Sequence, residues 1–185
     1  MKKLLFNRQH LREYITYGAI AAIAYIIPVW IFFLIKDYNY LGIIFCGSAL
    51  FMFVIMAYAY KLSRRRPDYK SAWMMIKATH LAAIVGIAFS VLLTTLLCFI
   101  YIPGFLSGSS ANVLDDAPAG LNNQNWSLIG LLYVCATVEN MGAGGFIGVL
   151  GPYVFKTNQT KDETEAEATR TEVRTSKPKV YSTGH

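Results

Sequence analysis

Residues 128–155 read LIGLLYVCATVENMGAGGFIGVLGPYVF, and this stretch decides which fold the chain can adopt. Its length is that of a membrane span, since about 20 apolar residues in a helix cross a bilayer. Near its centre stands one carboxylate, Glu139, which is followed directly by Asn140. An unpaired charge in hydrocarbon costs about 3 kcal/mol or more. The rest of the chain must therefore supply groups that lie close to Glu139 and stabilise it.

Three more uncharged runs precede that stretch, and the composition is that of a membrane protein. Of the 185 residues, 55% are apolar and only 15% are charged, whereas about 25% of the residues in an average soluble domain are charged. The four runs predict spans at about 14–35, 41–60, 78–102 and 128–155. We therefore expect an all-α integral membrane protein, with an antiparallel bundle of four transmembrane helices in residues 1–156.

The basic residues predict how such a bundle is oriented. Among the 17 lysines and arginines, only Lys36 falls in a connection that four spans would place opposite the two chain ends. Positively charged connections remain in the cytoplasm, so we expect both termini on the cytoplasmic side. The final segment, 157–185, carries charges of both signs and no apolar stripe. This composition predicts a disordered cytoplasmic tail.

The connection at residues 62–77 has the densest positive charge, with Arg64, Arg65 and Arg66 side by side. Each basic residue beside a bilayer attracts anionic lipid headgroups by about 1 kcal/mol. The three arginines are therefore candidate contacts for anionic lipid, although a topology signal is the simpler interpretation of the same charges. The net charge of +6 is explained in this way without nucleic acid as a partner.

Two faces would separate on the last span if it were a regular helix, which turns by about 100° per residue. Gly144 and Gly148 form a GxxxG pair, which lets helix backbones approach closely. We expect these glycines and Gly151 to pack against another helix of the chain, a second copy or another membrane protein. The glycine face comprises Thr137, Asn140, Gly144, Gly148 and Gly151. The opposite face comprises Leu132, Cys135, Ala136, Glu139, Ala143, Phe146 and Leu150.

Three arrangements would accommodate Glu139: protonation in low-dielectric surroundings, hydrogen bonds to polar groups at the same depth, or a water-filled cavity. His80 is a poor partner, because residue counting puts it about 15 Å away along the membrane normal. Glu139 and Asn140 are the candidates for handling a proton or an ion. Counting from the ends of each span offers as partners Tyr25, Ser48 and either Ser90 or Thr94.

Two short segments resemble a known group of proteins. They are the basic connection RRRPDYKSAW, residues 64–73, and GPYVFK, residues 151–156, at the end of the glycine-rich last span. Both are similar to segments of small four-span bacterial inner-membrane proteins that are grouped as domains of unknown function. The resemblance covers residues 14–156 and implies a multi-pass helical protein of the bacterial cytoplasmic membrane. It supplies no activity and no site residue.

No motif in the sequence indicates catalysis, a cofactor or a metal. The chain has neither HExxH nor GxSxG, the patterns that mark zinc peptidases and serine hydrolases. Each of the three cysteines, Cys46, Cys98 and Cys135, lies in a different apolar run without a CxxC partner. We therefore expect a non-enzymatic accessory or scaffold protein that acts by helix packing. The alternative is a small proton- or cation-coupled transporter or channel subunit that uses Glu139.

Overall fold

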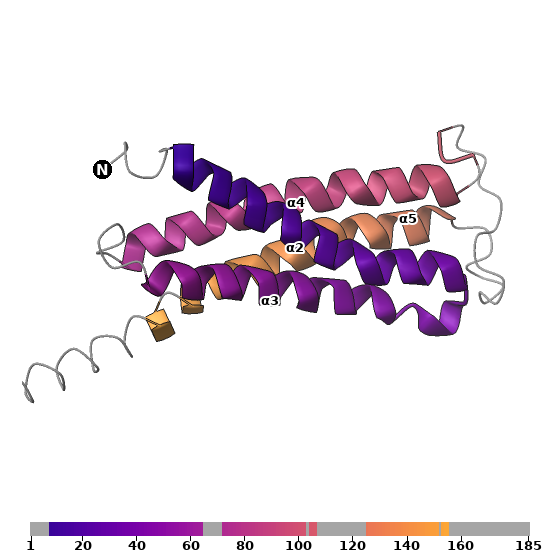
Figure 1. Ribbon diagram of the computed structural model, residues 1–185. Coiled ribbons are helices and arrows are strands. Elements are labelled where there is room, and N and C mark those ends of the chain that lie inside the picture. Colours follow the sequence, from indigo (N-terminus) through magenta and orange to yellow (C-terminus); the bar gives the residue numbers. More distant parts are fainter. Residues whose placement is uncertain (1–7, 65–71, 103, 107–124, 152, 156–185) are drawn as a thin grey trace, which may run out of the picture.

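The computed structural model describes residues 8–64, 72–102, 104–106, 125–151 and 153–155, and Figure 1 shows their arrangement. Over these residues the chain is helical between short turns and contains no strand. The first three long helices are α2 (Arg8–Ile35), α3 (Ile43–Arg64) and α4 (Ala72–Tyr101). A fourth helix is composed of α5 (Asn125–Val134), the π-helical turn η2 (Cys135–Glu139) and an α-helical segment at 140–151.

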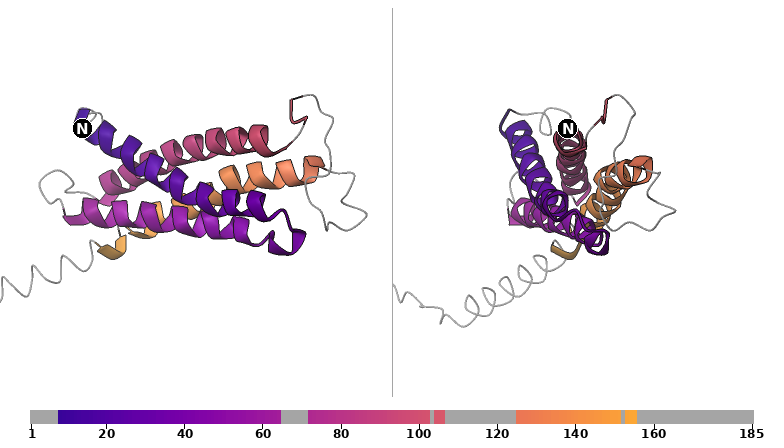
Figure 2. Two further views of the ribbon diagram at one scale, coloured as in Figure 1. Left: turned by 45° about the vertical axis from the view of Figure 1, so that its right-hand side comes forward. Right: turned by 90° about the vertical axis from the view of Figure 1, so that its right-hand side faces the viewer.

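The four helices lie side by side, and successive helices run in opposite directions (Figures 1 and 2). α2 packs along both α3 and α4, whereas α3 and α4 contact each other much less. The fourth helix packs on α3 and α4. Consequently the start of α2 and the end of the fourth helix lie at one end of the bundle, and the turn between α2 and α3 lies at the other.

A tight turn between α2 and α3 reverses the chain. α2 ends at Ile35, and the next residue, Lys36, has a left-handed φ of 57° and a backbone N–H that donates to Phe32 O at 2.9 Å. Such a residue terminates a helix, and for a side chain other than glycine it costs about 1–2 kcal/mol. Asp37 then caps the short helix η1 (Tyr38–Tyr40), because its Oδ1 accepts the backbone N–H of Asn39 at 2.8 Å. The turn therefore returns α3 directly alongside α2.

The helices extend beyond the spans predicted from hydropathy. α2 begins at Arg8 rather than near residue 14, and α4 begins at Ala72 rather than at residue 78. The predicted connection 62–77 is therefore too long, because residues 62–64 belong to α3 and residues 72–77 belong to α4. Arg65, Arg66, most of the 103–126 connection and the predicted tail lie outside the described residues.

Glycines allow α2 and α4 to approach within backbone contact. A Cβ atom added to Gly18 would lie 2.8 Å from the backbone nitrogen of Gly86 and 2.9 Å from Ala82 O. A Cβ atom added to Gly86 would in turn lie 2.8 Å from the ring of Phe51 on α3 and 3.2 Å from Gly18 O. Side chains larger than hydrogen do not fit at distances below about 3 Å. The crossing of these two helices therefore depends on the absence of a side chain at Gly18.

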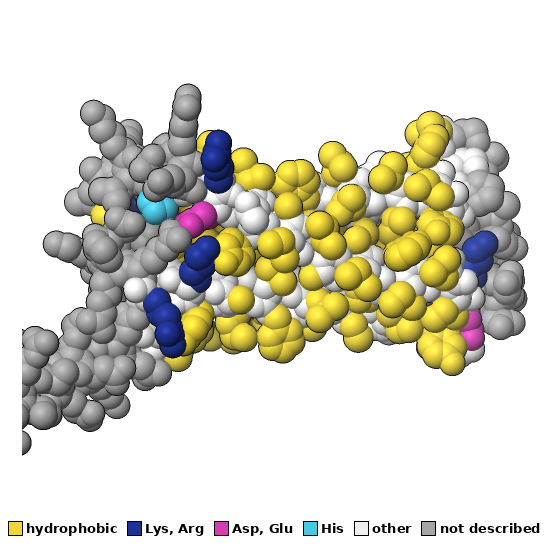
Figure 3. Space-filling model, viewed as in Figure 1, with side chains coloured by type: hydrophobic (Ala, Val, Ile, Leu, Met, Phe, Trp, Pro, Cys, Tyr) yellow, Lys and Arg dark blue, Asp and Glu magenta, His cyan; other side chains and the backbone are white. Residues whose placement is uncertain are grey.

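The outer surface of the bundle is apolar in the middle and charged at its ends. Large exposed apolar side chains occur on each long helix, and Ile23, Phe53, Leu92 and Phe146 are each more than half exposed. Figure 3 shows this apolar band, with most of the lysine and arginine side chains of this face at the end where α2 begins. Four helices are long and apolar enough to cross a membrane. The predicted all-helical fold with four such helices is confirmed.

Candidate functional site

The fourth helix is irregular at the position of Glu139. Within η2 the backbone N–H of Asn140 donates to Cys135 O, five residues earlier in the chain. Such a π-turn inserts one extra residue and changes which residues share a face. The prediction of two separate faces is therefore wrong here, because Ala136 and Asn140 are both fully buried. The interior-facing residues are Leu132, Cys135, Ala136, Asn140, Gly144, Gly148 and Gly151, while Phe146 and Leu150 are exposed.

Glu139 is half-buried and lies close to one side chain of its own helical turn and one of α2. Its carboxylate interacts with the thiol of Cys135 and with Tyr25 of α2. Tyr25 is fully buried, and its hydroxyl donates to Leu132 O in the fourth helix at 3.5 Å. The same hydroxyl neighbours the side chain of Thr94 on α4. Tyr25 therefore connects α2, α4 and the fourth helix at the level of Glu139.

Contacts along α4 and the fourth helix fix which residues of these two helices face each other. Near one end, the hydroxyl groups of Thr95 and Tyr133 are hydrogen-bonded at 2.7 Å. Farther along, Gly144 packs against Ala83. Since the two helices are antiparallel, these pairs place Ser90 opposite residues 137 and 138. Ser90 consequently lies within about two residues of Glu139 along the bundle axis, or about 3 Å.

α3 contributes a serine at the same level. Gly47 packs directly on Tyr25, because a Cβ on this glycine would lie 2.6 Å from Tyr25 O. The next residue, Ser48, is 4% exposed. One turn farther along α3, Phe51 packs near Gly144, and Ala59 contacts Gly151. Because α3 and the fourth helix run parallel, these two pairs align Ser48 with residues 140 and 141. We call the resulting set the polar layer: Tyr25, Ser48, Ser90, Thr94, Glu139 and Asn140.

Five oxygen atoms of the polar layer are buried and have no hydrogen-bond partner among the described residues. A buried polar atom without a partner costs about 1–3 kcal/mol. Other threonines of α4 avoid this cost, because Thr79 donates to Met75 O at 2.9 Å and Thr95 donates to Val91 O at 2.8 Å. The five oxygens are Ser48 Oγ, Ser90 Oγ, Thr94 Oγ1, Glu139 Oε2 and Asn140 Oδ1.

The three glycines of the last span that were predicted to pack against another helix, Gly144, Gly148 and Gly151, pack within the chain. Gly144 contacts Ala83, and Gly148 lies under the ring of His80, so that an added Cβ would be 2.5 Å from His80 Cε1. Gly151 contacts Ala59 of α3. His80 also makes a 2.8 Å hydrogen bond between its Nδ1 and Ile76 O. Because Gly148 is nine residues beyond Glu139, the ring of His80 is about 13 Å from the polar layer along the helix.

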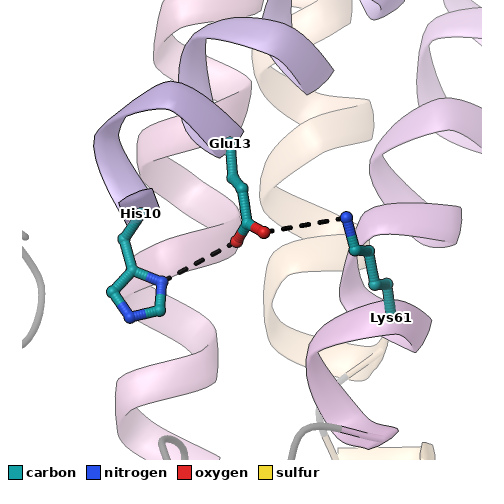
Figure 4. Close-up of polar contacts among 3 residues, drawn as sticks. All are labelled: His10, Glu13 and Lys61. Carbon is teal, nitrogen blue, oxygen red and sulfur yellow. Dashed lines mark ion pairs between the residues drawn. The ribbon is translucent and has the colours of Figure 1, made fainter. Parts of the chain in front are cut away.

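A second group of charged side chains lies at the end of the bundle where α2 begins. Figure 4 shows Glu13 of α2 between His10 and Lys61 of α3, with a nitrogen–oxygen distance of 3.7 Å to each. Lys61 also lies 4.8 Å above the ring of Tyr17. Arg64, the described member of the three predicted lipid-contacting arginines, is exposed and pairs with the ring of Tyr60. These contacts join α2 to α3 at the charged end.

Sequence reasoning found part of this arrangement. Depth counting selects Tyr25, Ser48 and either Ser90 or Thr94 beside Glu139, and in the structure both Ser90 and Thr94 belong to the polar layer. It missed the π-turn, for which the sequence carries no recognisable signal. It also missed the Glu13–Lys61 pair, although both residues flank apolar runs at the same side of the expected membrane. Within the described part of the chain, no three His, Cys, Asp or Glu side chains come together as a metal site.

Comparisons with known proteins supply no function for this arrangement. No family model matches the chain, and no curated protein or solved structure is detectably similar to it. The resemblance to four-span bacterial proteins stays a prediction. Any function has to be argued from the polar layer itself.

Proposed function

We propose that this protein is a non-enzymatic multi-pass membrane protein that handles a proton or a small cation at Glu139, as a small transporter or channel subunit would. The observation that carries the proposal is the polar layer, in which one carboxylate oxygen of Glu139 and four neutral side-chain oxygens are buried without a partner among the described residues. Ionisable residues inside a membrane are rare and mark ion or proton pathways. The π-turn at Glu139 adds support, since such turns occur frequently at functional sites.

In this proposal both chain ends face the cytoplasm of a bacterial cell. Lys61, Arg64 and Lys77 all belong to the connection between α3 and α4 or to its flanking turns, whereas Lys36 alone marks the opposite end of the described helices. The positive-inside rule assigns the more basic end to the cytoplasm. Single-cysteine labelling tests this orientation: a cysteine placed at Asn39 should react with a membrane-impermeant reagent added outside intact cells. Labelling at Arg64 instead would reverse the assignment.

The test of ion handling compares two carboxylates of the same chain. Purified protein in liposomes is assayed for proton flux with an enclosed pH dye and for sodium and potassium flux with ion-sensitive dyes. Glu139→Gln keeps the size of the side chain but cannot ionise, so flux should fall to the level of empty liposomes. Glu13→Gln makes the same chemical change at the charged end and should retain flux. Equal flux through the wild type, Glu139→Gln and empty liposomes would remove this proposal.

An accessory role through helix packing is the second candidate. It is favoured by the outward side of the fourth helix, where Gly142 and Gly145 have no atom within 4 Å of an added Cβ. The neighbouring Val138 and Met141 are more than 60% exposed. Small residues on an exposed helix face allow a second helix to approach closely. Replacement of both glycines by leucine should then abolish crosslinking to a partner or a second copy, while ion flux stays unchanged.

A further inference from the structure

The polar layer combines one carboxylate with several neutral oxygen atoms from four helices. Thr94 and Ser90 are fully buried on α4, and Asn140 is fully buried beside Glu139 in the fourth helix. We infer that this set binds a monovalent metal cation, with Glu139 as the charged ligand and these neutral oxygens as its companions. The inference rests on the proposed function, because it requires Glu139 to be a binding group.

The chemistry of the donors favours a hard metal ion. Carboxylate, carbonyl and hydroxyl oxygens are the ligands that hard cations prefer, whereas softer metals select sulfur and imidazole. The orientation of Asn140 agrees with this, since its Nδ2 donates to Ala136 O at 3.2 Å. The amide nitrogen is therefore engaged with the helix backbone, and Asn140 Oδ1 is left as a buried acceptor without a partner among the described residues.

The charge of the site selects a monovalent ion. Glu139 supplies one negative charge, and the described titratable groups that face it are Tyr25 and Cys135. Neither of these two groups carries a positive charge in any protonation state. One monovalent cation neutralises Glu139, whereas a divalent cation would leave an excess positive charge in a low-dielectric interior, which is strongly unfavourable.

Binding of a proton alone would give a partner to fewer of the buried oxygens than binding of a metal ion. Protonation neutralises Glu139 and gives it one hydrogen to donate, which can serve only one of the oxygens of Ser90, Thr94 and Asn140. A metal ion that prefers oxygen ligands contacts several oxygens at once. The fourth helix supplies two such oxygens next to its π-turn, because Glu139 Oε2 and Asn140 Oδ1 are both buried there.

The experiment measures thermal unfolding of the full-length protein in detergent, in sodium chloride, potassium chloride or choline chloride at equal ionic strength. Sodium or potassium should raise the Tm relative to choline, and the rise should grow with the logarithm of the ion concentration, as expected for binding to the folded state. Thr94→Val should lower the affinity for the ion by about tenfold, which corresponds to the loss of one interaction with a charged group. Glu139→Gln should remove the effect.

Thr79→Val is the matched control, because Thr79 lies on the same helix and is equally buried, but its hydroxyl already donates to the backbone. The ion-dependent rise in Tm should survive in this variant. A wild-type Tm that is the same in all three salts overturns the inference without the need for any variant. If proton flux in liposomes still depends on Glu139 in that case, the proposed function stands with the proton as its ligand. If neither flux nor ion-dependent Tm depends on Glu139, both proposals fail.

Discussion

The close crossing of α2 and α4 makes a quantitative prediction at Gly18. In Gly18→Ala the new methyl group would lie 2.8 Å from the backbone nitrogen of Gly86 and 2.9 Å from Ala82 O. Backbone atoms cannot rotate away as the end of a side chain can, so α2 and α4 must separate. Overpacking of this kind costs about 1–3 kcal/mol of stability. Replacement of a helical glycine by alanine stabilises the helix by about 1 kcal/mol. We expect a net destabilisation of up to about 2 kcal/mol.

The assay is reversible unfolding in mixed micelles followed by circular dichroism, with Gly142→Ala as the control. An added Cβ at Gly142 has no atom within 4 Å, so this variant should gain up to about 1 kcal/mol from helix propensity. The two alanine variants should therefore shift stability in opposite directions. Equal stabilisation of both would mean that α2 and α4 do not cross at Gly18, and the packing described above would be wrong.

Three further changes test other contacts. Gly148→Ala should destabilise the bundle by about 1 kcal/mol or more through a clash with the ring of His80, and His80→Ala should restore most of that loss in a double-mutant cycle read by Tm. Glu13→Gln should cost about 0.2–1 kcal/mol through the loss of its contact with Lys61, and the difference from the wild type should shrink at 1 M salt; a salt-independent loss would contradict an ionic origin. Trp30→Phe removes a 2.9 Å hydrogen bond from its Nε1 and should cost about 0.5–1 kcal/mol in chemical unfolding.

The number of long helices could be predicted because hydropathy reports directly on burial in lipid. Their ends could not, because a helix does not stop where the apolar residues stop. α2 continues through Arg12 and Glu13 to Arg8; the side chain of Arg12 is exposed, and Glu13 lies near His10 and Lys61. Hydropathy therefore marks the apolar band. It underestimates the length of each helix by the turns that extend beyond this band.

The depth of the polar layer was predictable, whereas the directions of its side chains were not. Counting residues along straight spans gives depth, because each residue adds about 1.5 Å of rise. The direction of a side chain can be predicted only if the helical register is unbroken, and the π-turn at Cys135–Glu139 interrupts that register. The tight packing of Gly18 and Gly47 also escaped prediction, because a glycine's importance depends on which helix lies next to it.

The extra residue in η2 lies between two halves of the fourth helix that are anchored separately. In the first half, the hydroxyl of Tyr133 is hydrogen-bonded to Thr95 of α4. In the second half, Gly148 packs against the ring of His80 of α4. Deletion of a single amino acid within η2 would remove this extra residue and restore a regular α-helix, while both anchors keep their register. Insertion of one more amino acid would instead turn one half by about 100° relative to the other and break one of the two anchors.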